Sequence, residues 1–212
     1  MAISMQFDQF WPLVRRCHLC QTEAAMPNAA VCHGCQQDLP WRLDTIQMDQ
    51  TAIHVIFDYQ WPLDRLLHLL KYQQRLDLLP FFRHALQQQP KLAIDAIVAM
   101  PCSAGRLRQR GYNQAQLLAQ LLSQLWQVPI WPHLQRIKHQ AAQQRLDRAE
   151  RMSNLQDAFA VTAQQQPPAR LLLIDDVLTT GSSFCSAAAC LRQAGATQIE
   201  GLILASRHQS TT

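Results

Sequence analysis

The chain alternates between two hydrophobic periods, which predict strands and helices in turn. Apolar runs of the length typical of buried strands lie at residues 52–59, 94–100, 128–131, 171–174 and 198–205. Apolar residues at helical spacing predict a helix that begins at Pro62 and further helices over residues 74–88, 112–126 and 182–194. Because strands alternate with helices, we expect an α/β fold with a mainly parallel sheet and helices on both faces.

The first part of the chain has a different pattern. Residues 14–42 are rich in Cys, His, Gln and Pro and show little apolar periodicity. We therefore expect a small module at residues 1–45 and a main domain at residues 46–212. The composition, with 48% hydrophobic and 16% charged residues among 212, suits an ordinary folded core and argues against general disorder.

Two Cys-x-x-Cys pairs, separated by eleven residues, give the small module its chemistry. Four thiolates at this spacing suit a tetrahedral zinc ion, and so small a module needs a metal to fold. Four protein ligands leave no open position on the metal, so the predicted role of zinc is structural. His18 and His33 lie inside the pairs and remain alternative ligands. The predicted ligands are Cys17, Cys20, Cys32 and Cys35.

Cysteine usage and hydropathy also bear on the compartment. The odd number of cysteines, seven, argues against a disulfide framework, and we interpret Cys102, Cys185 and Cys190 as core or near-core thiols. The sequence has neither a signal peptide nor an apolar run long enough to cross a membrane. We expect a cytoplasmic protein that is not an integral membrane protein. The inner face of the membrane, reached through partners, is an alternative location.

The predicted strand at 171–174 leads into a segment suited to phosphate and ribose. Two carboxylates follow the strand, and a loop rich in hydroxyl groups then opens the helix at 182–194. Such a loop presents backbone N–H groups and the positive end of the helix dipole, which favour a phosphate. The acid pair is suited to accept hydrogen bonds from two vicinal ribose hydroxyls. The predicted site for a 5′-phosphorylated ribose consists of Asp175, Asp176, Val177, Leu178, Thr179, Thr180, Gly181, Ser182 and Ser183.

A basic run follows another predicted strand, at the edge where a parallel sheet presents its ligands. Arg106, Arg108 and Arg110 carry guanidinium groups, which suit phosphate oxygens. We predict that they contact pyrophosphate or nucleic acid, which the formal net charge of +4 permits. Asn113 is either a further contact or a helix cap. The polar segment 138–155 is interpreted as a loop that closes over the site, with a plain linker as the alternative.

Several of these stretches resemble known families. Residues 174–183 resemble the signature with which type I phosphoribosyltransferases bind phosphoribosyl pyrophosphate (PRPP). The cysteine pairs and residues 66–72 and 106–114 resemble segments of the ComF family, named for competence in DNA uptake. So does the polar segment that contains Gln143, Arg148, Arg151 and Asn154. The chain is thereby identified as a member of this family, although Cys102 stands where members often carry leucine.

The resemblance implies a type I phosphoribosyltransferase-like fold with a structural zinc ion and with PRPP and Mg²⁺ as ligands. It implies that Asp175 and Asp176 hold the ribose hydroxyls and that residues 179–183 cradle the 5′-phosphate. It also implies a part in natural transformation, with single-stranded DNA and DNA-uptake proteins as partners. Three functions remain open: phosphoribosyl transfer to an undefined acceptor, catalytically silent sensing of PRPP or a nucleotide, and binding of single-stranded DNA as an interaction protein.

Overall fold

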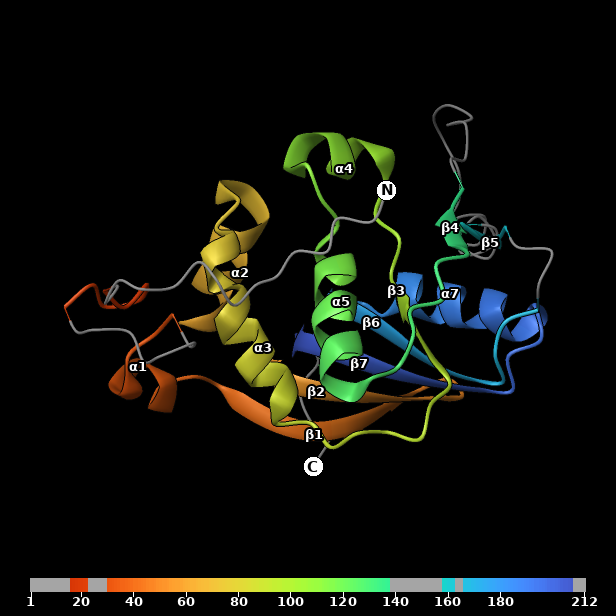
Figure 1. The fold of residues 1–212 in the computed structure, drawn as a ribbon, viewed down its shortest axis with the longest axis horizontal. Helices are drawn as coiled ribbons and strands as arrows, with labels where there is room; N and C mark the ends of the chain where they lie inside the picture. The colour runs from red at the N-terminus through yellow and green to blue at the C-terminus, as the bar shows by residue number, and fades with distance from the viewer. Residues whose placement is uncertain (1–15, 23–29, 138–157, 163–165, 208–212) are drawn as a thin grey trace.

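The computed structural model describes residues 16–22, 30–137, 158–162 and 166–207, and a five-stranded sheet lies at its centre (Figure 1). The strand order is β1-β2-β7-β6-β3. The strands from β2 to β3 run parallel, whereas β1 pairs with β2 antiparallel. A separate antiparallel pair joins β4 to β5. The strands are β1 (Trp41–Met48), β2 (Thr51–Asp58), β3 (Ala96–Ala99), β4 (Leu134–Arg136), β5 (Phe159–Val161), β6 (Arg170–Leu178) and β7 (Gln198–Ser206).

Helices cover both faces of this sheet (Figure 1). Helices α2 (Leu63–Gln73), α3 (Leu79–Gln87) and α5 (Gln114–Trp126) pack on one face, and α7 (Ser182–Gln193) packs on the other. Side chains alternate across a strand, so Leu172 and Ile174 of β6 join the first core and Leu171 and Leu173 join the second. None of the described helices is long and apolar enough to span a membrane. The predicted α/β fold is confirmed.

Several predicted elements differ from the observed ones. The predicted end of a strand at residue 174 is wrong, because β6 stays paired with β7 as far as Leu178. The predicted helix at 74–88 is a 3₁₀ turn, η2 (Leu76–Leu78), followed by α3. Residues 128–131 form only a single bridge, between Ile130 and Ile97. β1, the β4–β5 pair and the helix α4 (Ala104–Arg110) had no counterpart among the predicted elements.

The cysteine-rich segment packs onto the α2–α3 side of the molecule. It contains the short helix α1 (His33–Gln37) and leads directly into β1. Its buried residues Cys17, Val31 and Leu39 belong to the same hydrophobic core as Leu66 and Phe81. The boundary at residues 45 and 46 stays a prediction.

Candidate functional site

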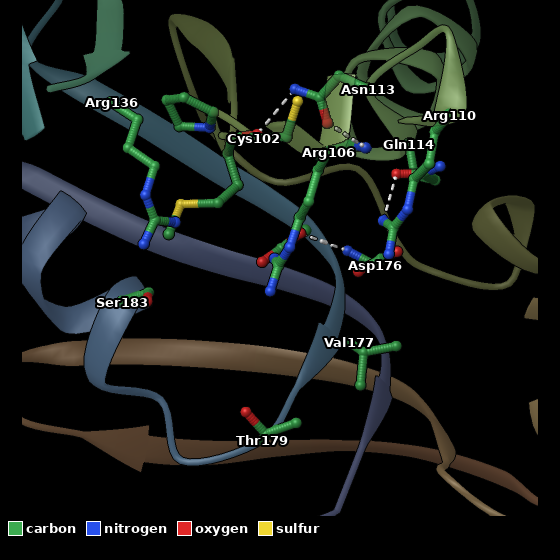
Figure 2. A pocket seen from close by; sticks show the side chains of 14 residues that line it. Cys102, Arg106, Arg110, Asn113, Gln114, Arg136, Asp176, Val177, Thr179 and Ser183 are labelled. Carbon is green, nitrogen blue, oxygen red and sulfur yellow. Dashed lines mark hydrogen bonds between the residues drawn. The ribbon is translucent and has the colours of Figure 1, made fainter. Parts of the chain in front are cut away.

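The acid pair lies within β6, close to the carboxyl end of the strand. Asp175 is in register with Ile203 of the neighbouring strand β7, so the sheet fixes its backbone. The backbone N–H of Asp176 donates a 2.8 Å hydrogen bond to Oδ1 of Asp175. Both side chains line a pocket at this edge of the sheet, together with Val177, Thr179 and Ser183 (Figure 2).

The two carboxylates have different environments. Desolvation, together with the neighbouring charge of Asp176, raises the pKa of Asp175 from 3.8 to about 8. The N–H of Asp176 and the charges of Lys71 and Arg106 oppose this increase. Asp176 itself forms an ion pair with Lys71 of α2, with 2.8 Å between Oδ2 and Nζ. The pair therefore combines a carboxyl group that favours its neutral form with a carboxylate that has its own cation.

The loop between β6 and α7 is shaped by a glycine. Gly181 has φ +75°, and a Cβ atom there would lie 2.1 Å from the methyl carbon of Met48. It also occupies the N-cap of α7, where no side chain caps the first turn. Backbone N–H groups at an uncapped helix start favour an anion.

The predicted loop residues do not all face the pocket. Thr179 and Ser183 line it, whereas the side chain of Leu178 is buried in the hydrophobic core. The hydroxyl groups of Thr180 and Ser182 lie 3.2 Å apart and hydrogen bond to each other. Leu178 therefore supports the loop from beneath and cannot contact a ligand with its side chain.

The three predicted arginines lie on α4, where helical spacing separates them. Arg106 and Arg110, four residues apart, both line the pocket, whereas Arg108 is exposed and is absent from its lining. Ser103 caps the helix by accepting a 3.3 Å hydrogen bond from the N–H of Arg106. Arg110 donates to Oε1 of Gln114 at 3.0 Å, which fixes its guanidinium group.

Asn113 lines the pocket and also caps α5. Its Oδ1 accepts a hydrogen bond from the N–H of Ala115 at 3.2 Å, and its Nδ2 donates to the carbonyl oxygen of Met100 at 2.9 Å. The cap, one of the two alternatives for this residue, is thus present. The second bond ties the start of α5 to the end of β3.

The pocket lining also includes residues that were not predicted from the sequence, among them Arg136 and Cys102. Arg136 of β4 reaches the pocket, and its guanidinium carbon lies 5.5 Å from the ring centroid of Phe159. Figure 2 shows the guanidinium groups of Arg106 and Arg136 pointing toward the segment that runs from Thr179 to Ser183 at the start of α7. Cys102, which we interpreted as a core or near-core thiol, is half-buried and also lines the pocket.

No periodic pattern marks Arg136, because its place depends on the pairing of β4 with a strand more than twenty residues later. The predicted closing loop at 138–155, with Gln143, Arg148, Arg151 and Asn154, lies outside the described residues.

The four cysteines of the small module come together as predicted. The sulfur atoms of Cys17, Cys20, Cys32 and Cys35 all lie within 4.8 Å of one another. The N–H of Cys35 points to Sγ of Cys32 at 3.5 Å, and that of Leu19 to Sγ of Cys17 at 3.4 Å. This cluster can hold a metal ion such as zinc, because its donor set consists of four soft sulfur atoms.

The two histidines inside the cysteine pairs have other environments. His33 is exposed. His18 is buried, and its Nδ1 accepts a 2.9 Å hydrogen bond from Arg75. Its Nε2 lies 3.2 Å from Oδ2 of Asp77. The His18 ring thus connects the cysteine cluster to the turn that follows α2.

No protein-family model matches the chain. The chain is 37% identical over 109 residues to competence protein F of Haemophilus influenzae. This matching stretch covers 50% of this chain and 48%, about half, of that protein. It is 31% identical over 204 residues to DNA utilization protein YhgH of Escherichia coli (strain K12), covering 89% of this chain and 81% of that protein. Adenine phosphoribosyltransferase from Saccharomyces cerevisiae is a structural neighbour with a TM-score of 0.40 and 18% identity, covering 64% of this chain and 72% of that chain.

Proposed function

The chain belongs to the ComF family, and from this premise we propose that its pocket binds a 5′-phosphorylated ribose such as PRPP. One observation carries the proposal: the acid pair of β6, Thr179, Ser183 at the start of α7, and three arginines line a single pocket. In this arrangement Asp175 and Asp176 accept hydrogen bonds from ribose hydroxyls. The loop binds the 5′-phosphate, and Arg106, Arg110 and Arg136 neutralise the pyrophosphate.

Transfer would break the bond between ribose C1 and pyrophosphate and form a bond from C1 to an acceptor. The arginines would stabilise the leaving group, and Mg²⁺, when it enters bound to PRPP, would share that charge. The residues that line this pocket do not identify an acceptor. We therefore expect slow or absent turnover with free purines and pyrimidines, and silent sensing of PRPP or a nucleotide remains the alternative.

Two measurements test this function. Calorimetry with ribose 5-phosphate and with PRPP should show binding at one site per chain, and absence of binding would refute the proposal. Pyrophosphate release from PRPP with Mg²⁺ and a panel of acceptors then distinguishes an enzyme from a sensor. A turnover near the enzyme median of about 10 s⁻¹ with a free base would contradict the expected slow reaction.

For the small module, we propose a structural zinc ion held by the cysteine cluster. The compact set of four sulfur atoms supports this proposal, because thiolates are zinc ligands. Metal binding would also supply folding free energy, which a module of so few residues cannot obtain from its own core. With all four positions filled by protein, the ion takes no part in chemistry at the pocket.

A second function, contact with single-stranded DNA during uptake or use of DNA, is favoured by the exposed face of α2 and α4. Trp61 and Tyr72 are 63% and 53% exposed. Guanidinium groups lie over their rings, Arg65 at 6.0 Å from Trp61 and Arg110 at 5.1 Å from Tyr72. Aromatic rings stack with bases, and cations bind the backbone. The names of the relatives, which refer to competence and DNA utilization, agree with this second function.

Fluorescence anisotropy with a labelled single-stranded oligonucleotide tests the DNA contact. Affinity should fall steeply as salt increases, because phosphate contacts release counterions. Replacing Arg106, Arg108 and Arg110 together by alanine should weaken binding, and Lys91→Met, at an exposed lysine elsewhere, is the control. If neither added salt nor the triple substitution changed the affinity for the oligonucleotide, this surface would be excluded as the DNA-binding site.

A further inference from the structure

A lysine already occupies the acid pair. Nζ of Lys71 lies 2.8 Å from Oδ2 of Asp176, and the two side chains are only 15% and 13% exposed. Lys71 comes from the last turn of α2, far from β6 in the sequence. Because both groups are largely withdrawn from water, their attraction is screened much less than that of a surface pair.

The structure holds the Lys71 ammonium group in place. Leu66, Leu67 and Leu70 anchor α2 in the core with no exposed surface. The hydroxyl group of Tyr112 donates to the carbonyl oxygen of Leu70, so the end of α2 is tied to the link between α4 and α5. The cation is therefore positioned before any ligand arrives.

This arrangement does not fit a resident divalent cation. Oδ1 of Asp175 accepts the N–H of Asp176, and Oδ2 of Asp176 faces the ammonium group. A second cation at the same carboxylates would be repelled by Lys71 and by the arginines that line the pocket. Mg²⁺ also gives up its water reluctantly and is usually held by carboxylates that are open to it.

We propose that Lys71 takes the place of a divalent cation at the acid pair, so that the pocket binds a 5′-phosphorylated ribose without Mg²⁺. The inference rests on the proposed function. It confines any Mg²⁺ dependence to ligands that carry the ion themselves, as PRPP does on its pyrophosphate. Ribose 5-phosphate, which lacks pyrophosphate, separates the two sources.

Calorimetry with ribose 5-phosphate is the first test. Magnesium is removed by dialysis, because a chelator would also strip the cysteine cluster. The wild-type protein should bind with the same affinity with and without added Mg²⁺. Lys71→Met should bind about tenfold more weakly without Mg²⁺, because the Asp176 carboxylate loses its ion pair with Lys71, and added Mg²⁺ should restore part of the affinity. Lys71→Arg, which keeps the charge, should retain more affinity than Lys71→Met, and Lys91→Met, on the surface, should behave like the wild type.

The outcomes separate this inference from the function beneath it. Wild-type binding that requires Mg²⁺ overturns the role of Lys71 and leaves the ribose phosphate site in place. So does Lys71→Met binding that equals the wild type without Mg²⁺. Absence of ribose 5-phosphate binding in both buffers overturns the proposed function and this inference together.

Binding of Mn²⁺ to the ligand-free protein, followed by electron paramagnetic resonance, gives an independent test. The wild-type pocket should bind no Mn²⁺, and Lys71→Met should gain one site that is lost again in Lys71→Met/Asp176→Asn. A Mn²⁺ site in the wild type that Asp176→Asn removes would overturn the inference, as would a Lys71→Met protein without the new site.

Discussion

The cysteine cluster and the ribose phosphate pocket are built in opposite ways. The four sulfur atoms come from a single stretch of fewer than twenty residues and meet within 4.8 Å. The pocket takes its side chains from α4, α5, β4, β6 and the start of α7, between residues 100 and 183. A local cluster follows from spacing along the chain, whereas the pocket exists only when the whole sheet is assembled.

This difference predicts how each region responds to substitution. A change in the cluster should act on folding, because its residues share a hydrophobic core with α2 and α3. A change at a polar side chain of the pocket should act on binding, because the polar residues that line it lie outside the hydrophobic core.

The largest effect is expected from Cys17→Ser/Cys35→Ser. The double substitution removes two of the four predicted ligands, so the protein should no longer bind the metal. Structural zinc contributes binding free energies of about 10–16 kcal/mol in small modules, so the melting temperature should also fall strongly. Elemental analysis and thermal denaturation measure both. Cys185→Ser, at a half-buried thiol on α7, should leave the metal content unchanged. Unchanged metal in the double variant would refute the cluster as its site.

Asp175→Asn/Asp176→Asn should weaken the binding of ribose 5-phosphate by on the order of a hundredfold, because a hydrogen bond to the Asp176 carboxylate contributes about 1.5–3 kcal/mol and one to the neutral form of Asp175 about 0.5–1.5 kcal/mol. The fold should survive, which circular dichroism checks. Asp64→Asn, on α2 away from the pocket lining, is the matched control. Equal affinity of the double variant and the wild type would remove the acid pair from the site.

Within α4, arginines that line the pocket can be compared with one that does not. Arg106→Ala and Arg110→Ala should each weaken PRPP binding about tenfold, since each removes one charged contact to the pyrophosphate. Arg108→Ala should leave the affinity unchanged, because Arg108 does not line the pocket. Titration calorimetry of the three variants under one salt condition decides. Equal losses for all three would point to a general charge effect.

A further prediction concerns the pH dependence of stability. The folded protein raises the pKa of Asp175 from 3.8 to about 8. Between these values the folded state keeps a proton that the unfolded state has lost, so the stability of the ligand-free protein falls as the pH rises. Asp175→Asn should remove this contribution and be relatively more stable above pH 8. Melting temperatures across this range, with Asp64→Asn as the control, should show converging curves at low pH; parallel curves would contradict the assignment.

The sequence predicted the parts of both sites that depend on local order. The cysteine spacing and the order of strand, acid pair, hydroxyl loop and helix are local, and the structure brings these residues together. The arginines were predicted as one group, because a run of charges does not reveal a helix as short as α4. Its period then turns Arg108 away from Arg106 and Arg110.

Features that depend on distant partners were missed. β6 extends past residue 174 because β7 continues to pair with it, which no local pattern shows. Arg136 reaches the pocket through the β4–β5 pair, and Lys71 reaches Asp176 through the packing of α2. These contacts depend on tertiary packing and not on local secondary-structure propensity, so the hydrophobic pattern of the sequence does not predict them.

The cysteine module and α2 share one hydrophobic core, so a metal bound at the cluster would also affect the stability of this helix. A metal that binds only the folded cluster stabilises, by mass action, every element that unfolds together with it. Cys17, Val31 and Leu39 pack with the leucines of α2, the helix that carries Lys71. The concentration of free metal would therefore set how much of the chain is folded. Depletion of that metal would thus reduce the number of folded pockets as well as the number of intact clusters.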